Sequence, residues 1–216
     1  IPPASARSAP SQASPWSRLP GILARIRPPV FPARDFLLTA FGAVPDGETD
    51  ASAAFRAAID ACQRAGGGRV VVPAGVFLTG PIHLKSRVNL HVTRGATIRF
   101  SRDPERYLPA VLTRWEGVEL MGYSPLVYAF EQRDVAITGE GTLDGQAGPE
   151  HWWPWKSDGH PRSQKADRAL LLRQAELGVP VAERRFGSGH SLSSTSVSSP
   201  SAISRNFFIT GTTLSR

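Results

Sequence analysis

One short phrase recurs along the chain, and this repetition constrains the fold more than any other feature. Residues 133–143 read RDVAITGEGTL, and residues 205–214 read RNFFITGTTL. A looser third copy, RVNLHVTRGATI, occupies residues 87–98. Because repetition of one strand-turn-strand unit is typical of solenoids, the sequence predicts coils that stack on one another.

The region around the third copy predicts short parallel strands. No two-residue Asn-Gly or Asp-Gly loop joins neighbouring strands as a hairpin, and no helices alternate with them as in βαβ units. Arg133 follows Arg87 by 46 residues, which we interpret as two turns of about 23 residues. The predicted fold class is therefore all-β, a right-handed parallel β-helix. Its expected strands are 70–72, 76–78, 82–84, 88–92 and 96–100.

A helix is predicted over residues 49–65, just before these strands. Thr49 or Asp50 can accept hydrogen bonds from the first free amides, and three glycines follow Ala65. Its apolar residues recur at helical spacing and form one stripe, so we expect the helix to cover the open apolar end of the solenoid. The stripe consists of Phe55, Ala58, Ile59, Cys62 and Ala65.

The remaining segments suggest how the chain is organised. Residues 1–15 are rich in Pro and Ser, which predicts a disordered arm. Residues 16–216 are expected to form the N-terminal part of a single β-helix domain that is truncated at its C-terminal end, with a strand at 35–41 and a long loop excursion over 145–204. Nine of the 17 residues from 188 to 204 are serine, and one hypothesis is that 191–204 come from a shifted reading frame.

Three stretches resemble a known enzyme family. They are FGAVPDGETD followed by AGGGRVVVPAG, then RWEGVELMGYSPLVYAF, and finally ITGEGTLDGQAGPEHWWPWK. Over residues 16–190 the chain is similar to the N-terminal portion of glycoside hydrolase family 28, the polygalacturonase-type enzymes within the pectate-lyase-like β-helices. The resemblance implies a right-handed parallel β-helix that hydrolyses α-linked galacturonate chains with inversion, acting outside the cytoplasm as a secreted or periplasmic protein.

The catalytic motifs of that family do not occur in this sequence. The family uses an Asn-Thr-Asp motif, an Asp-Asp pair, a Gly-His-Gly and an Arg-Ile-Lys, and none of the four is present. Gly189-His190-Ser191 lacks the second glycine, and Arg25-Ile26-Arg27 precedes the coil. We therefore assign no catalytic residue and expect the 216-residue chain to be inactive; the resemblance implies no cofactor.

Two groups of residues are candidates for substrate binding. Trp152, Trp153 and Trp155 offer flat apolar faces that could stack on sugar rings, although tryptophans that clamp a loop onto the coil are the simpler explanation. Arg114 and Glu116 flank Trp115, and the guanidinium could hold a uronate carboxylate in a bidentate pair. An Arg–Glu pair on the surface is the simpler reading of this second group.

Other polar residues are better explained by structural roles. Asp46, Asp50 and Asp144 lie where turns and helix starts are predicted, and Asp103 and Glu105 form another acidic grouping. The five histidines lack the spacing of metal ligands, so no metal site is predicted. The only cysteine cannot form an internal disulfide.

The formal net charge of +7 points to an acidic partner, but its distribution is uneven. Residues 1–34 contain five arginines and no acidic residue, which leaves +2 for the remaining chain. Nucleic-acid motifs are absent, and no apolar run reaches membrane-spanning length, so we expect neither nucleic acid nor membrane as partner. An acidic polysaccharide of the pectin type is the expected ligand; a polysaccharide lyase and a non-catalytic binding or adhesion β-helix remain alternatives.

Overall fold

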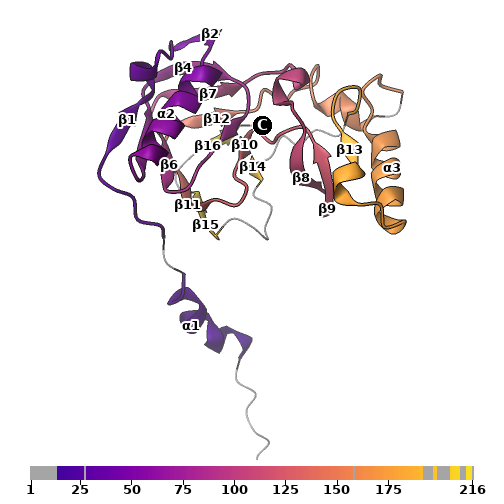
Figure 1. The fold of residues 1–216 in the computed structure, drawn as a ribbon, viewed down its shortest axis with the longest axis horizontal. Helices are drawn as coiled ribbons and strands as arrows, with labels where there is room; N and C mark the ends of the chain where they lie inside the picture. Colours follow the sequence, from indigo (N-terminus) through magenta and orange to yellow (C-terminus); the bar gives the residue numbers. More distant parts are fainter. Residues whose placement is uncertain are drawn as a thin grey trace, which may run out of the picture.

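The computed structural model describes residues 14–26, 28–157, 159–191, 197–198, 205–209 and 213–215. Most of the predicted arm at 1–15, and residues 192–196 and 199–204 of the serine-rich segment, lie outside the described residues. The described chain winds as a right-handed parallel β-helix whose coils stack their strands into three parallel sheets of five, five and three strands (Figure 1). The fold class predicted from the sequence is confirmed.

Each sheet collects strands from successive coils, and every pair of neighbours within the three sheets is parallel. The first sheet contains β1 (Asp35–Leu37), β3 (Gly68–Val72), β6 (Val88–Val92), β11 (Arg133–Gly139) and β15 (Arg205–Ile209). The second contains β2 (Asp46–Asp50), β4 (Gly75–Thr79), β7 (Ala96–Phe100), β12 (Thr142–Asp144) and β16 (Thr213–Ser215). The third contains β5 (Ile82–His83), β10 (Val127–Tyr128) and β14 (Val197–Ser198).

The repeated phrase marks neighbouring rungs, as predicted. Ile137 of β11 pairs with Ile209 of β15, and Leu143 of β12 pairs with Leu214 of β16. The third copy is also a neighbouring rung, because Leu90 of β6 pairs with Ile137. The 46 residues between Arg87 and Arg133 therefore belong to one coil, and the prediction of two turns was wrong. Inserted segments between β7 and β10 supply the extra length.

One of these inserted segments is a β-hairpin, which the sequence analysis did not anticipate. β8 (Val111–Trp115) and β9 (Val118–Gly122) are antiparallel and are joined by Glu116 and Gly117. Both turn residues have positive φ, 47° and 88°, the backbone combination that a type I′ hairpin turn requires. Glu116-Gly117 thus forms a two-residue hairpin turn, although the sequence analysis sought only Asn-Gly and Asp-Gly at such turns.

The core is a column of apolar side chains inside the coils. Val70 pairs with Leu90 in the first sheet and Phe77 pairs with Ile98 in the second, and all four side chains are inaccessible to solvent. Burying one such side chain stabilises the fold by roughly 1.5–3 kcal/mol. Each added coil therefore extends a continuous apolar column, which is the physical reason that the repeat persists.

The helix α2 (Ser52–Arg64) covers the N-terminal end of this column, as Figure 1 shows. Phe55, Ala58, Ile59 and Cys62 are at most 2% exposed, so these four residues of the predicted stripe form the buried face. Ala65, the fifth, follows the end of the helix and is only partly buried. The helix begins three residues later than predicted. Residues 46–50 form β2 instead, and Asp50 accepts a hydrogen bond from the amide of Ser52 before the first helical turn.

The chain before the first coil contains two short helices, η1 (Pro15–Arg18) and α1 (Leu19–Leu23), which lie away from the coils in Figure 1. The predicted strand over residues 35–41 is shorter than expected: β1 ends at Leu37, and η2 (Leu38–Phe41) follows as a 3-10 helix. Among the described residues, no helix combines the length and the apolar character needed to span a bilayer.

The long excursion leaves the coil after β12 and packs beside the hairpin (Figure 1). Phe186 and Leu171 of the excursion and Leu120 of β9 form a small second core, each at most 1% exposed. The predicted excursion ran without interruption over 145–204, whereas β14 returns to the third sheet within it. Its elements are η4 (Trp153–Lys156), α3 (Lys165–Glu176), η5 (Val181–Glu183) and β13 (Arg185–Phe186), and β13 pairs with β9 in parallel.

Candidate functional site

The tryptophan loop, residues 148–156, begins with a strained turn. Trp152 has φ 67° and ψ −51°, and the amide of Trp153 donates to the carbonyl oxygen of His151 at 2.9 Å. A hydrogen bond between residues two apart with this sign of φ is the rare, strained form of the γ-turn. Such strain persists only where surrounding contacts hold it, and here the buried ring of Trp152 supplies them.

The three tryptophans of this loop have different environments. Trp152 and Trp155 are 7% and 3% exposed and their ring centroids lie 4.6 Å apart, whereas Trp153 is 53% exposed. His151 meets both buried rings edge-on, at 4.8 and 5.9 Å. Trp152 and Trp155 therefore pack against one another and against His151 inside the loop. Only Trp153 presents an open ring to solvent.

Two ring nitrogens in this loop are buried without a hydrogen-bond partner among the described residues. They are Nε1 of Trp152 and Nε2 of His151. Burial lowers the pKa of His151, and the positive charge of Arg102 lowers it further. The guanidinium of Arg162 lies 5.3 Å from the ring centroid of Trp155, a cation–π distance. His151 is therefore neutral at pH 7 and is packed between the two buried tryptophan rings.

Arg114 and Glu116, which the sequence suggested as a uronate-binding pair, have different partners. Arg114 donates through Nη2 to Glu119 at 2.7 Å, directly across the hairpin. Glu116, in the hairpin turn, accepts from Nε of Arg168 on α3 at 2.9 Å. Arg114 and Glu116 thus each form a surface Arg–Glu pair, but not with one another. Both pairs are partly exposed. The pair of Arg114 with Glu119 joins the two strands of the hairpin, and the pair of Glu116 with Arg168 joins the hairpin to the excursion.

The acidic groupings form turns and helix starts. Asp46 accepts from the amides of Glu48 and Thr49 at 2.8 Å and from the hydroxyl of Thr49 at 2.6 Å. The bond from the Thr49 hydroxyl, together with the two amides, lowers the pKa of Asp46. Asp103 accepts from the amide of Glu105 at the start of η3 (Pro104–Tyr107). These carboxylates are already committed to backbone donors.

The strand histidines are also hydrogen-bonded. His91 lies 2.8 Å from the hydroxyl of Thr138, which donates to Asn89. His83 contacts the hydroxyl of Ser124 at 3.0 Å. In the part of the chain that the structure describes, no three His, Cys, Asp or Glu side chains gather in a group that could hold a metal ion.

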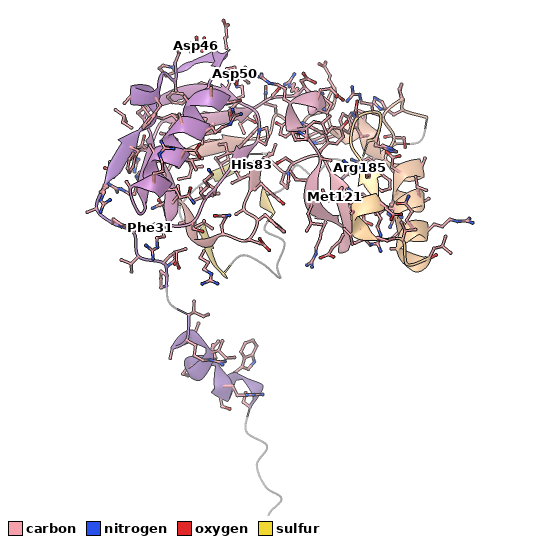
Figure 2. All side chains as sticks on the ribbon, viewed as in Figure 1. Phe31, Asp46, Asp50, His83, Met121 and Arg185 are labelled. Atoms are coloured by element: carbon pink, nitrogen blue, oxygen red, sulfur yellow. The ribbon has the colours of Figure 1, made fainter. Side chains whose placement is uncertain are left out.

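A cavity of about 490 Å³ between α2, β5 and the segment after η3 was missed by the sequence analysis. Its basic side chains are Arg56 of α2, Lys85 of the loop after β5 and Arg106 of η3, which are widely separated in the sequence. No local motif connects them. Asp50 and His83, labelled in Figure 2, line the cavity from β2 and β5.

Comparisons with known proteins agree with this architecture. A family model described as rhamnogalacturonase A/epimerase, pectate lyase-like, matches residues 38–91. A probable polygalacturonase of Vitis vinifera is 35% identical over 125 residues, which are 54% of this chain and 25% of that protein. An exo-poly-alpha-D-galacturonosidase of Dickeya chrysanthemi is 34% identical over 116 residues, which are 50% of this chain and 19% of that protein.

A solved structure extends the similarity over nearly the whole chain. The structure of a hyperthermoactive exopolygalacturonase from Thermotoga maritima has a TM-score of 0.81 and 47% sequence identity, and the match covers 90% of this chain and 44% of that one. The coil topology and these matches define a polygalacturonase-like right-handed parallel β-helix. The resemblance to glycoside hydrolase family 28 is thereby confirmed. The chain spans at most a quarter of the two curated relatives.

Proposed function

We propose that the chain is part of a glycoside hydrolase that cleaves α-linked galacturonate in pectin-type polysaccharide. The observation that carries this proposal is the 47% identity to the Thermotoga maritima exopolygalacturonase over 90% of the chain. Similarity of that extent, with a TM-score of 0.81, includes both insertions and not only the repeating coils. The acidic polymer is the proposed partner, and a secreted or periplasmic location follows from the size of such a substrate.

The proposed chemistry is inverting hydrolysis by two carboxyl groups. One carboxylic acid protonates the leaving oxygen, and a carboxylate on the opposite face activates water. None of the carboxylates described above is assigned to either role, because Asp46, Asp50 and Asp103 serve turns and helix starts. The 216-residue chain is accordingly proposed to bind polymer without cleaving it.

The proposed contribution of this chain is polymer binding through Trp153. Its ring is half exposed and lies on the excursion beside the hairpin, and a flat indole suits the C–H face of a pyranose. A stacking contact of about 0.5–1.5 kcal/mol predicts that Trp153→Ala weakens oligogalacturonate binding by roughly 2- to 12-fold.

This prediction is checked by calorimetric titration with an oligogalacturonate. Leu177→Ala is the matched control, because Leu177 is an apolar side chain of the same excursion and is 70% exposed. The control is expected to bind as the unmodified chain does. Equal affinities of Trp153→Ala and the unmodified chain would remove Trp153 from the proposed binding surface.

The reaction itself is tested with polygalacturonate as substrate. The protein encoded by the complete gene is expected to release reducing ends without forming an unsaturated product that absorbs in the ultraviolet, whereas the 216-residue chain is expected to release none. An unsaturated product would identify a lyase instead. Polymer binding without turnover by the complete gene product would favour the non-catalytic alternative.

A further inference from the structure

The cavity beside α2 has the size and the mixed lining of a small-molecule site. Its volume of about 490 Å³ lies within the range of roughly 300–1,000 Å³ that is usual for ligand pockets. One wall is apolar and comes from Tyr107, Leu108, Pro109 and Val111. The lining from α2 is mixed, with Ser52, Arg56 and Asp60 beside Phe55 and Ile59, so a ligand with one apolar face and one charged group fits this arrangement.

The charges that line the cavity leave one cation unmatched. Lys85 pairs with Asp60 at 2.6 Å, and Arg106 pairs with Asp50. Arg56 also lines the cavity, and no acidic group lies within salt-bridge distance of it in the described part of the chain. With His83 neutral, the lining carries three positive and two negative charges. The net charge of +1 centres on Arg56.

His83 supplies a neutral acceptor at the same cavity. The hydroxyl of Ser124 donates to the carbonyl oxygen of Pro125 at 3.0 Å and therefore accepts from Nε2 of His83. This arrangement leaves Nδ1 of the neutral ring as a hydrogen-bond acceptor. Burial lowers the pKa of His83, and the charge of Arg56 lowers it further, so the ring keeps this form at pH 7.

We propose that this cavity binds a monosaccharide acid, with the carboxylate on Arg56 and a hydroxyl donating to Nδ1 of His83. The planar guanidinium matches a carboxylate in a bidentate pair. The carboxylates of Asp50 and Asp60 offer further acceptors for sugar hydroxyls, and the wall formed by Tyr107 and its neighbours packs against the apolar face of the pyranose. The choice of a hexuronate rests on the proposed function; the need for a carboxylate rests on the cavity alone.

The test is calorimetric titration of the 216-residue chain with D-galacturonate and with D-galactose, which lacks the carboxylate. Galacturonate is expected to bind, and galactose at least tenfold more weakly. Arg56→Ala is expected to lose at least tenfold in galacturonate affinity. Arg64→Ala is the matched control, because Arg64 is exposed on the same helix and does not line the cavity, and it should leave the affinity unchanged.

The outcomes separate this site from the proposed function. Equal binding of galactose and galacturonate, or unchanged affinity in Arg56→Ala with an unaltered circular dichroism spectrum, would overturn the cavity proposal. Trp153→Ala is expected to weaken binding of the polymer and leave binding of the monosaccharide intact. Loss of monosaccharide binding in Trp153→Ala would place the ligand elsewhere and refute the cavity. The test of the proposed function, release of reducing ends by the complete gene product, does not depend on whether the cavity binds a monosaccharide.

Discussion

Gly139 tests how closely neighbouring coils approach one another. It ends β11 with φ 106° and pairs with Val92 of the preceding coil. A Cβ at this position would lie 2.0 Å from the carbonyl oxygen of Val92 and 2.7 Å from its carbonyl carbon. Both atoms belong to the backbone and cannot rotate away. Gly139→Ala therefore requires the two coils to separate at their tightest turn.

The expected cost has two main parts. A non-glycine residue at this φ adds about 1–3 kcal/mol of strain. The carbonyl oxygen of Val92 also accepts from the amide of Gly141 at 3.0 Å, and displacing it loses a hydrogen bond of about 1 kcal/mol. Together with local repacking, we expect a loss of about 3–5 kcal/mol in the free energy of unfolding, equivalent to a fall in Tm of roughly 6–20 °C.

Gly95 is the matched control for this substitution. It occupies the same kind of turn, between β6 and β7, with φ 78°, but an added Cβ would meet only the Cβ of Ala74 at 3.5 Å. Gly95→Ala should therefore lose only about 1–2 kcal/mol from backbone strain. Urea unfolding followed by circular dichroism compares the two variants. If Gly139→Ala were no less stable than Gly95→Ala, the close approach of β6 and β11 would be refuted.

Three further perturbations follow from individual side chains. Burial raises the pKa of the Cys62 thiol to about 11, so a thiol reagent at pH 8 should label it only after denaturation; rapid labelling of the folded chain would show that α2 does not cover the coil. Burial lowers the pKa of His151, so its neutral form is fully stabilising above its ordinary value of about 6.5 and loses that contribution as the pH falls below it. Urea midpoints at pH 7 and pH 5 should therefore differ less in His151→Asn than in the unmodified chain, and an equal difference would contradict this assignment. Arg168→Ala removes a half-exposed ion pair with Glu116 and should cost no more than about 1 kcal/mol; a larger loss in urea unfolding would mean that the excursion depends on this contact.

The coil architecture could be read from the sequence because local pattern and global fold agree. The repeated phrase places inward residues such as Leu90 and Ile137 at matching positions, and the structure pairs them. The number of coils could not be read in the same way, because a count of residues does not distinguish a second turn from an insertion. The hairpin also escaped prediction, since its turn at Glu116 depends on a left-handed φ that this residue type rarely adopts.

The candidate site was less predictable, because its contacts join residues far apart in the sequence. The sequence suggested that Glu116 pairs with Arg114, two residues away, but its partner is Arg168 on α3. The three tryptophans have the same side chain and nearly the same sequence context, yet only Trp153 is exposed. The γ-turn at Trp152 separates their orientations, and no local sequence pattern predicts that turn.

Both insertions leave the coil at the same point, after the second sheet and before the third. In the coil of β4 and β5 this connection is only Gly80 and Pro81, whereas the next two coils place the hairpin and the excursion there. Insertions at one position of a solenoid gather on one side, and the pairing of β9 with β13 joins these two into one structure. The short connection of Gly80 and Pro81 also borders a cavity. Gly80 and Pro81 line the cavity of Arg56 together with α2 and residues 106–109.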